Sequence, residues 1–241
     1  YLWHKTGSKM RVLFGTLLLY VLVFISMTTP TYVNAIFPQS ARFSFNITFN
    51  RLLIFVFVIS WCIILPMQFK ESGRILFCNC RPLRLVHWLL MALTGFALAY
   101  FYGHAQPLST NLVLHSCIAI VAICSVWLSS VFINDIFDVE IDAVSNPRRP
   151  MPSQRADGKA MTGYVLMLAG VALASSLGTG FIAFWILLTF YASYTVYSVP
   201  PLRLKRIPVL SKAAVSVNSL LMVVLGYHLA GAFAFGGGMR H

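Results

Sequence analysis

Seven long apolar segments constrain the fold of this chain more than any other feature of its sequence. They cover residues 12–29, 52–67, 85–102, 112–133, 162–177, 181–198 and 209–235. A helix needs about 20 apolar residues to cross the hydrocarbon core of a bilayer. Inside lipid, backbone polar groups have to be satisfied within the spanning structure, which favours helices. The sequence therefore predicts an all-α, polytopic transmembrane helical bundle of about seven spans.

The composition supports a membrane protein rather than a soluble domain. Hydrophobic residues make up 59% of the chain and charged residues only 10%, with a mean hydropathy of +0.79. A net charge of +12 raises the question of nucleic-acid binding. In a membrane protein, however, the distribution of positive charge among loops carries more information than its total. We therefore expect the lipid bilayer, and no nucleic acid, as a partner.

The loop charges predict how the spans are oriented. With seven alternating spans, fifteen of the 18 Lys and Arg residues fall on one side of the membrane, and only Arg42, Arg51 and Arg240 fall on the other. The positive-inside rule places the richer side in the cytoplasm. The prediction is thus an integral, multi-pass membrane protein whose acidic motif faces the cytoplasm, with the loop at 30–50 outside.

That acidic motif is NDIFDVEID, at residues 134–142. It holds four of the six acidic residues of the chain, namely Asp135, Asp138, Glu140 and Asp142. If the preceding helix continues through it, Asn134, Asp138 and Asp142 recur every fourth residue and share one face, with Asp135 beside them. Carboxylates held this close repel one another unless a cation neutralises them, and oxygen ligands suit Mg2+. The motif predicts a magnesium site formed by Asn134, Asp135, Asp138 and Asp142.

Basic residues flank this motif in two loops. They are Arg148 and Arg149, with Arg155 and Lys159 beyond them, and then Arg203, Lys205 and Arg206 after a helical hairpin. Mg2+ in proteins is commonly held by one or two carboxylates together with substrate phosphates, while arginine binds phosphate oxygens in a fork. The pattern predicts a diphosphate ligand, and the apolar surroundings suggest that it carries a hydrocarbon chain.

Two segments of the sequence resemble one known family. NDIFDVEIDAVSNPRRPMPS is similar to the first aspartate-rich signature of the UbiA superfamily of intramembrane prenyltransferases, and TVYSVPPLRLKR is similar to the segment that follows in those enzymes. Their order and the number of spans between them also agree. Within the superfamily, the two segments look most like the branch of chlorophyll synthases and geranylgeranylglyceryl phosphate prenyltransferases.

The resemblance implies transfer of a prenyl group from an allylic prenyl diphosphate to a lipophilic acceptor, an aromatic ring or a hydroxyl, with Mg2+ as cofactor. Carried over by position, it implies catalytic roles for Asp138, Asp142, Arg149, Tyr197 and Lys205. It implies diphosphate binding by Arg148, Arg149, Ser198, Arg203, Lys205 and Arg206. Aromatic faces such as those of Trp185, Tyr194 and Tyr197 would stabilise a carbocation-like prenyl group.

The chain also departs from the family pattern. Outside residues 135–157 its only acidic residue is Glu71, so a second aspartate-rich motif does not occur in it. Two predicted spans precede the residues that resemble the family. We therefore expect residues 1–81 to be an N-terminal extension with two transmembrane helices, and 82–241 to be a partial UbiA-like domain, C-terminally incomplete and with little or no turnover.

Two other interpretations remain open on the sequence alone. A non-catalytic or degenerate relative would keep the helices and lose the reaction. A transporter would use intramembrane carboxylates as an ion path, which predicts acidic residues in mid-span rather than at a helix end. The sequence leaves the acceptor, the prenyl length and the oligomeric state undetermined.

Overall fold

The computed structural model describes residues 75, 79–108, 110–153 and 156–231, which form helices joined by short loops. The elements are α5 (Pro82–Phe101), α6 (Thr110–Phe137), α7 (Val139–Ser145), α8 (Gly158–Thr179), α9 (Phe181–Ser198), the 3-10 turn η1 (Leu204–Arg206) and α10 (Pro208–Leu229). No strand occurs among the described residues. The predicted all-α class is therefore confirmed.

Five helices are long and apolar enough to cross a membrane: α5, α6 from Leu112, α8, α9 and α10, with mean hydropathies between 1.4 and 2.3. Helix α9 has the predicted bounds, and α6 extends four residues beyond its predicted end at 133. Helix α10 ends at Leu229 rather than at 235, because Ala230 caps it and Gly231 turns the chain with a φ of 93°. The predicted spans at 12–29 and 52–67, and the loop at 30–50, lie outside the described residues.

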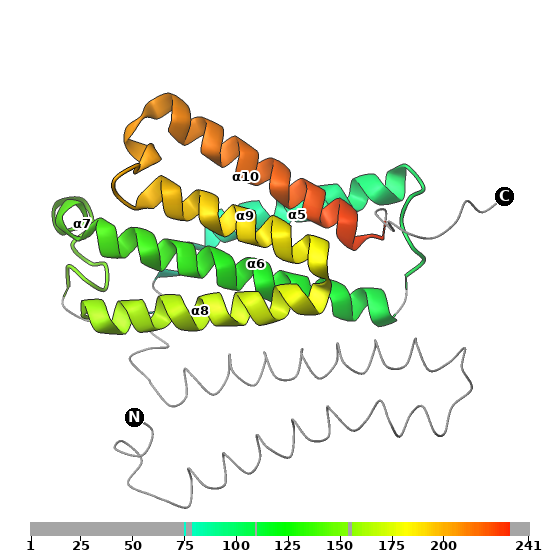
Figure 1. Ribbon diagram of the computed structural model, residues 1–241, viewed down its shortest axis with the longest axis horizontal. Helices are drawn as coiled ribbons and strands as arrows, with labels where there is room; N and C mark the ends of the chain where they lie inside the picture. The colour runs from blue at the N-terminus through cyan, green and yellow to red at the C-terminus, as the bar shows by residue number, and fades with distance from the viewer. Residues whose placement is uncertain (1–74, 76–78, 109, 154–155, 232–241) are drawn as a thin grey trace, which may run out of the picture. The chain divides into compact units, whose positions relative to one another are not determined.

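The long helices pack as two pairs with α9 in contact with both. Helix α6 packs along α8, and α5 packs along α10, while α9 contacts α6, α8 and α10. Figure 1 shows these helices running alongside one another, with the short α7 beyond the end of α6. This arrangement brings the end of α6 close to the loop between α9 and α10.

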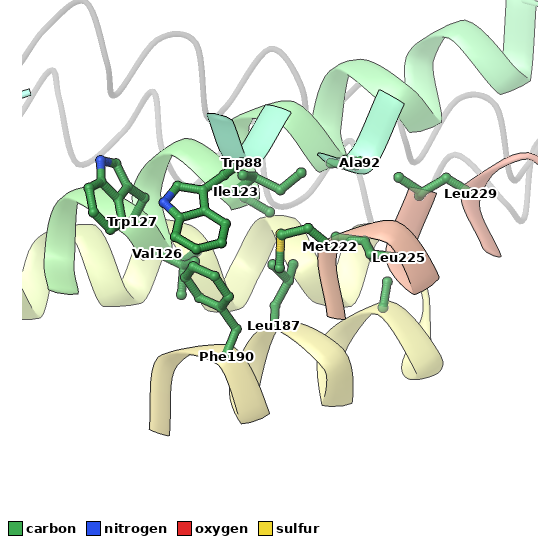
Figure 2. Packing of buried hydrophobic residues seen from close by; sticks show 14 of the residues in the cluster. Trp88, Ala92, Ile123, Val126, Trp127, Leu187, Phe190, Met222, Leu225 and Leu229 are labelled. Atoms are coloured by element: carbon green, nitrogen blue, oxygen red, sulfur yellow. The ribbon is translucent and has the colours of Figure 1, made fainter. Parts of the chain in front are cut away.

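The main hydrophobic core lies where α5, α6, α9 and α10 meet. Each helix contributes buried side chains, and Figure 2 shows them converging from the four elements: Trp88 and Ala92, Ile123, Val126 and Trp127, Leu187 and Phe190, and Met222, Leu225 and Leu229. The Trp88 ring packs edge-on against Phe190 with their centroids 5.2 Å apart. The aromatic part of this core extends to Tyr194, whose centroid lies 5.5 Å from that of Trp127.

Two glycines allow α5 and α10 to approach closely. A Cβ atom added at Gly226 would lie 1.7 Å from the carbonyl oxygen of Ala92, and one at Gly95 would lie 1.8 Å from that of Val223. Both obstacles are backbone atoms, so no side-chain rotation can relieve the overlap. Small residues commonly permit this kind of contact between membrane helices, where van der Waals packing drives association.

We expect Gly226→Ala to force α5 and α10 apart and to lower the free energy of unfolding by about 1–3 kcal/mol, the usual range for overpacking. Gly170→Ala on α8 is the matched control, because its added Cβ would meet no atom within 4 Å. That control should be neutral, or stabilising by up to about 1 kcal/mol through helix propensity. Thermal unfolding in detergent measures both variants, and equal midpoints would contradict the close contact.

Candidate functional site

The acidic motif lies at a break between two helices. Helix α6 ends at Phe137, Asp138 leaves the helical conformation with φ −109° and ψ 11°, and α7 begins at Val139. The sequence had suggested one continuous helix with Asn134, Asp138 and Asp142 on a common face. Because of the break, the four oxygen-bearing side chains instead form two groups.

The first group joins Asn134 and Asp138 to the loop after α9. Lys205 Nζ donates to Asn134 Oδ1 at 2.8 Å and also to Asp138 Oδ2, while Arg203 donates to Asp138 Oδ1. Ser198, the last residue of α9, donates its hydroxyl to Asn134 Oδ1 at 3.3 Å. Both oxygens of Asp138 are thus paired with cations from one loop.

The second group joins Asp135 and Asp142 through Arg149. Arg149 Nη1 donates to Asp135 Oδ1 at 3.0 Å and also to Asp142 Oδ2. Arg81 Nη2 donates to the same Oδ1 of Asp135 at 2.6 Å, and Asn79 Nδ2 donates to its Oδ2 at 2.8 Å. Asp135 and Asp142 are both buried, as is Asp138 in the first group. We call the two groups together the ionic layer: Asn79, Arg81, Asn134, Asp135, Asp138, Asp142, Arg149, Ser198, Arg203 and Lys205.

Arg203 also explains why α6 stops where it does. Its Nη2 donates at 2.9 Å to the carbonyl oxygen of Phe137, the last residue of α6. The final carbonyls of a helix have no partner within it and need one from elsewhere. Arg203 supplies one of these bonds and holds Asp138 as well, so the helix end and the ionic layer are fixed by one side chain.

The loop that carries Arg203 and Lys205 is shaped by its prolines. The bond between Pro200 and Pro201 is cis, and the amide of Arg203 donates to the carbonyl of Val199 at 3.0 Å. Proline has no amide hydrogen and cannot continue a helical ladder, so α9 ends before this pair. The chain then turns through η1 and restarts as α10 at Pro208.

Two arginines of the ionic layer have a left-handed backbone. Arg81 has a φ of 44° and Arg203 a φ of 39°, and the described residues include no other non-glycine residue with a positive φ. This conformation costs an L-residue about 1–2 kcal/mol. Both arginines donate to a carboxylate of α6 or of the break that follows it. Uncommon backbone conformations of this kind cluster at functional sites.

The ion pairs control the charge of Asp138. Burial alone would raise the pKa of this carboxyl, but hydrogen bonds from Lys205 and Arg203 outweigh burial and hold the pKa below its ordinary value. The carboxylate is therefore ionised at neutral pH. An ionised, charge-assisted pair is stronger than a neutral hydrogen bond.

The structure brings together most, but not all, of the predicted site residues. Those in the ionic layer are Asn134, Asp135, Asp138, Asp142, Arg149, Ser198, Arg203 and Lys205. Arg148 and Arg206 are exposed and form no ion pair with a described carboxylate. Tyr197 accepts a hydrogen bond from Ser211 at 3.4 Å and packs edge-on against Tyr194. Trp185 is half exposed, thirteen residues from the end of α9 at Ser198, and contacts Phe181 and Phe184.

Sequence reasoning missed Asn79 and Arg81. They precede α5, more than fifty residues before Asp135 in the chain. The only available signal was the basic character of this loop, which had been used to orient the membrane spans. No local pattern connects an asparagine in this position to a carboxylate on another helix.

The oxygen atoms of the first group suit a hard cation. Asn134 Oδ1 and Asp138 Oδ2 both accept from the ammonium of Lys205, which marks a point where two oxygen ligands converge on positive charge. Asp142 uses one carboxylate oxygen for Arg149, and no hydrogen bond to its other oxygen is found among the described residues. Within these residues no three His, Cys, Asp or Glu side chains form a ready metal cluster. A metal would therefore be held by the carboxylates of Asp138 and Asp142 and the amide oxygen of Asn134, together with oxygens of a bound ligand, since Mg2+ is usually bound by one or two carboxylates plus substrate phosphates.

We expect the ion pairs of Asp138 to make stability depend on pH. A carboxyl with a lowered folded pKa stabilises the fold above its unfolded pKa of about 3.9, and this contribution is lost as pH falls through the folded value. Asp138→Asn should therefore be destabilised at pH 7 by about 1–3 kcal/mol, since it leaves two partly buried cations without their carboxylate. The gap in thermal midpoint between wild type and variant, measured from pH 3 to pH 7, should narrow below about pH 4. A gap that stays constant would show that Asp138 is not ionised in the fold.

Comparison with known proteins links these residues to one family. Residues 83–236 match the model of the UbiA prenyltransferase family. A digeranylgeranylglyceryl phosphate synthase of Korarchaeum cryptofilum is 35% identical over 99 residues, which cover 41% of this chain and 34% of that protein. Synthases of the same name from Thermococcus gammatolerans and Thermococcus sibiricus are each 31% identical, over 105 and 122 residues that cover 44% and 50% of this chain. No solved structure matches the chain significantly.

The matched region is only part of each relative. It covers 34%, 37% and 42% of the three synthases, so the chain spans about two fifths or less of their length. The family match includes α6, α8, α9, α10 and all of α5 except Pro82, and it covers the ionic layer from Asn134 to Lys205 but not Asn79 and Arg81.

Proposed function

The chain belongs to the UbiA prenyltransferase family, and we propose that its ionic layer binds the diphosphate of a prenyl donor for transfer to a lipophilic acceptor. The five long apolar helices and the family together make it an integral, multi-pass membrane protein. A hydrocarbon substrate would lie among these helices. Its charged group would lie at the helix ends, where the described acidic and basic residues meet.

The observation that carries this proposal is the pairing of Asp138 with Arg203 and Lys205. Two cations from the loop after α9 are held at the end of α6 by one ionised carboxylate. Basic side chains gathered in this way suit the oxygens of a diphosphate, and arginine can bind such oxygens with two parallel hydrogen bonds. An acidic side chain beside them suits a divalent cation that would bind together with the diphosphate.

The chemistry we propose is electrostatic stabilisation of a leaving group. Magnesium, when bound by Asn134, Asp138 and Asp142, would neutralise charge on the departing diphosphate. Arg149, Arg203 and Lys205 would donate hydrogen bonds to phosphate oxygens as negative charge accumulates there. Prearranged cations lower the barrier because they need little reorganisation during bond cleavage.

An aromatic cluster lies below the ionic layer. Trp88 lies seven residues after Arg81, which caps the start of α5, and Trp127 lies seven residues before Asn134 on α6, a distance of roughly 10 Å along a helix axis. Tyr194 on α9 packs edge-on against both tryptophans. Aromatic faces attract positive charge, so this cluster suits the prenyl carbon that becomes electron-poor when the diphosphate leaves. Of the aromatic residues that the sequence suggested for this role, Tyr194 lies in the cluster and Tyr197 packs against Tyr194, whereas Trp185 packs against Phe181 and Phe184.

The acceptor is best inferred from the relatives. The matched synthases are named for digeranylgeranylglyceryl phosphate, which points to a hydroxyl of a prenylated glyceryl phosphate as acceptor in those proteins. We propose a hydroxyl acceptor of this lipophilic type for this protein, in preference to an aromatic ring. Since the 241 residues contain one aspartate-rich motif, ligand binding tests the site more directly than turnover does.

We expect a non-hydrolysable prenyl thiolodiphosphate to bind the purified chain in a Mg2+-dependent manner. Asp138→Ala should weaken that binding by at least about tenfold, since it removes a metal ligand and the carboxylate that positions Arg203 and Lys205. Glu140→Gln is the matched control, because Glu140 lies in the same motif, is exposed, and forms no ion pair with a described cation. Isothermal titration calorimetry with and without Mg2+ measures the affinities.

Two results of that titration, and one of a separate ion-flux measurement in vesicles, would count against the proposal. Binding that is indifferent to both Mg2+ and Asp138→Ala would exclude a diphosphate site in the ionic layer. Equal losses in Asp138→Ala and Glu140→Gln would indicate a general effect of surface charge. Mg2+-dependent transport of ions without any diphosphate binding would favour the transporter interpretation instead.

We also expect the ionic layer to face the cytoplasm, as the loop charges predict. A reporter fused after residue 40 should then report a location outside the cytoplasm. The same reporter fused after residue 153, in the loop between α7 and α8, should show the opposite result. Cytoplasmic activity of the first fusion would reverse the proposed orientation.

A further inference from the structure

Asn79 and Arg81, which precede α5, both donate to the same carboxylate of the ionic layer, that of Asp135. Asn79 Nδ2 donates to one oxygen of Asp135 at 2.8 Å, and Arg81 Nη2 donates to the other at 2.6 Å. Arg149 completes the set by donating to the same oxygen as Arg81, at 3.0 Å. Asp135 therefore connects the start of α5, the end of α6 and the loop after α7.

The surroundings of Asp135 differ from those of Asp138. The Asp135 side chain is only 3% exposed, whereas that of Asp138 is 12% exposed, and Asp135 lies inside α6 rather than at the break. One of its partners, Asn79, is a neutral amide that is itself 3% exposed. A diphosphate would attract the cations around Asp138, but it exerts no comparable attraction on a buried neutral amide. Asp135 is thus held in place by a partner that substrate binding would not remove.

Arg81 and Arg149 are held close to each other by this carboxylate. Their terminal nitrogens lie 2.6 Å and 3.0 Å from the same oxygen, so they are at most 5.6 Å apart. Two guanidinium groups at this separation repel each other unless negative charge lies between them. Arg81 and Arg149 are 20% and 25% exposed, and each guanidinium has five N–H donors, more than its hydrogen bonds to these carboxylates use. The pair can therefore accept further oxygen atoms from an anion.

Arg81 is one of four cations in the ionic layer, which outnumber its carboxylates by one. The ion pairs connect three carboxylates, those of Asp135, Asp138 and Asp142, to four cations. Without Arg81 the connected charges would cancel, and with it they leave one positive charge in excess. Arg81 has a left-handed backbone, which is unfavourable for a non-glycine residue. The position of this cation therefore costs some conformational free energy.

We propose that Arg81 is a diphosphate-binding residue, and that Asp135 is the counter-ion that positions Arg81 and Arg149 rather than a ligand of the metal. This inference rests on the proposed function, because it assigns roles within the same site. It separates the four oxygen-bearing residues of the motif into metal ligands, Asn134, Asp138 and Asp142, and one positioning residue.

The first test replaces the cation. Arg81→Gln should weaken binding of a non-hydrolysable prenyl thiolodiphosphate on the order of tenfold, the effect of losing one charge-assisted hydrogen bond, while the Mg2+ concentration for half-maximal binding stays unchanged. Arg84→Gln is the matched control, because Arg84 lies one turn further along α5, is exposed, and pairs with no described carboxylate. Arg81→Lys keeps the charge but loses the fork, so its affinity should lie between wild type and Arg81→Gln.

The second test compares the two carboxylates. At saturating thiolodiphosphate, Asp138→Asn should raise the half-saturating Mg2+ concentration at least about tenfold, whereas Asp135→Asn should leave it within about twofold of wild type. Asp135→Asn should instead lower the affinity for the diphosphate analogue, because its two arginines lose their common anchor. Bound Mn2+, counted by electron paramagnetic resonance, gives a second readout that does not depend on turnover.

The outcomes separate this inference from the proposed function. If wild type does not bind the analogue, both fail. Suppose that wild type binds the analogue in a Mg2+-dependent manner. If the affinity of Arg81→Gln then equals that of wild type, or is no lower than that of the control Arg84→Gln, only the role of Arg81 fails. If Asp135→Asn raises the Mg2+ requirement as Asp138→Asn does, Asp135 is a metal ligand and the division of roles is wrong. Thermal midpoints identify any variant that does not fold, and Arg81→Lys then decides the role of Arg81.

Discussion

The structure depends on the neutralisation of three carboxylates buried at one end of α6. An isolated ionised carboxylate near hydrocarbon is costly, and here each one is paired with at least one cation that another segment contributes. Arg81 comes from the start of α5, Arg149 from the loop after α7, and Arg203 and Lys205 from the loop after α9. The ion pairs therefore connect four segments that lie far apart in the sequence.

Packing below this level explains why the cations can be placed so accurately. Helices α5 and α10 touch backbone to backbone at Gly95 and Gly226, and α9 contacts α6, α8 and α10. The tryptophans of α5 and α6 meet Phe190 and Tyr194 of α9 in one aromatic cluster. Because α5, α6, α9 and α10 each carry or adjoin a residue of the ionic layer, rigid packing in the core limits where the charged side chains can lie.

The sequence predicted the helices better than it predicted the site. The bounds of α9 could be inferred because a glycine-rich turn and a proline pair enclose an uncharged run, and both signals are local. The break at Asp138 could not be inferred, since it depends on Arg203 bonding to Phe137 from 66 residues away. The periodicity of the acidic motif assumed a continuous helix, and so it grouped Asp142 with Asp138 rather than with Asp135. Asn79 and Arg81 were not predicted either, because their partner Asp135 is more than fifty residues away and no residue near them in the sequence indicates it.

The pairing seen in the structure has a consequence for ligand exchange. Arg203 and Lys205 hold both oxygens of Asp138, so a metal that binds this carboxylate would compete with those cations unless they move to another anion. A diphosphate supplies such an anion at the same moment as it supplies further ligands for the metal. Binding of metal and diphosphate should therefore be mutually favourable, and by thermodynamic linkage each must raise the affinity for the other by the same factor. Asp135 lies outside this exchange, because its neutral partner Asn79 has no reason to leave it.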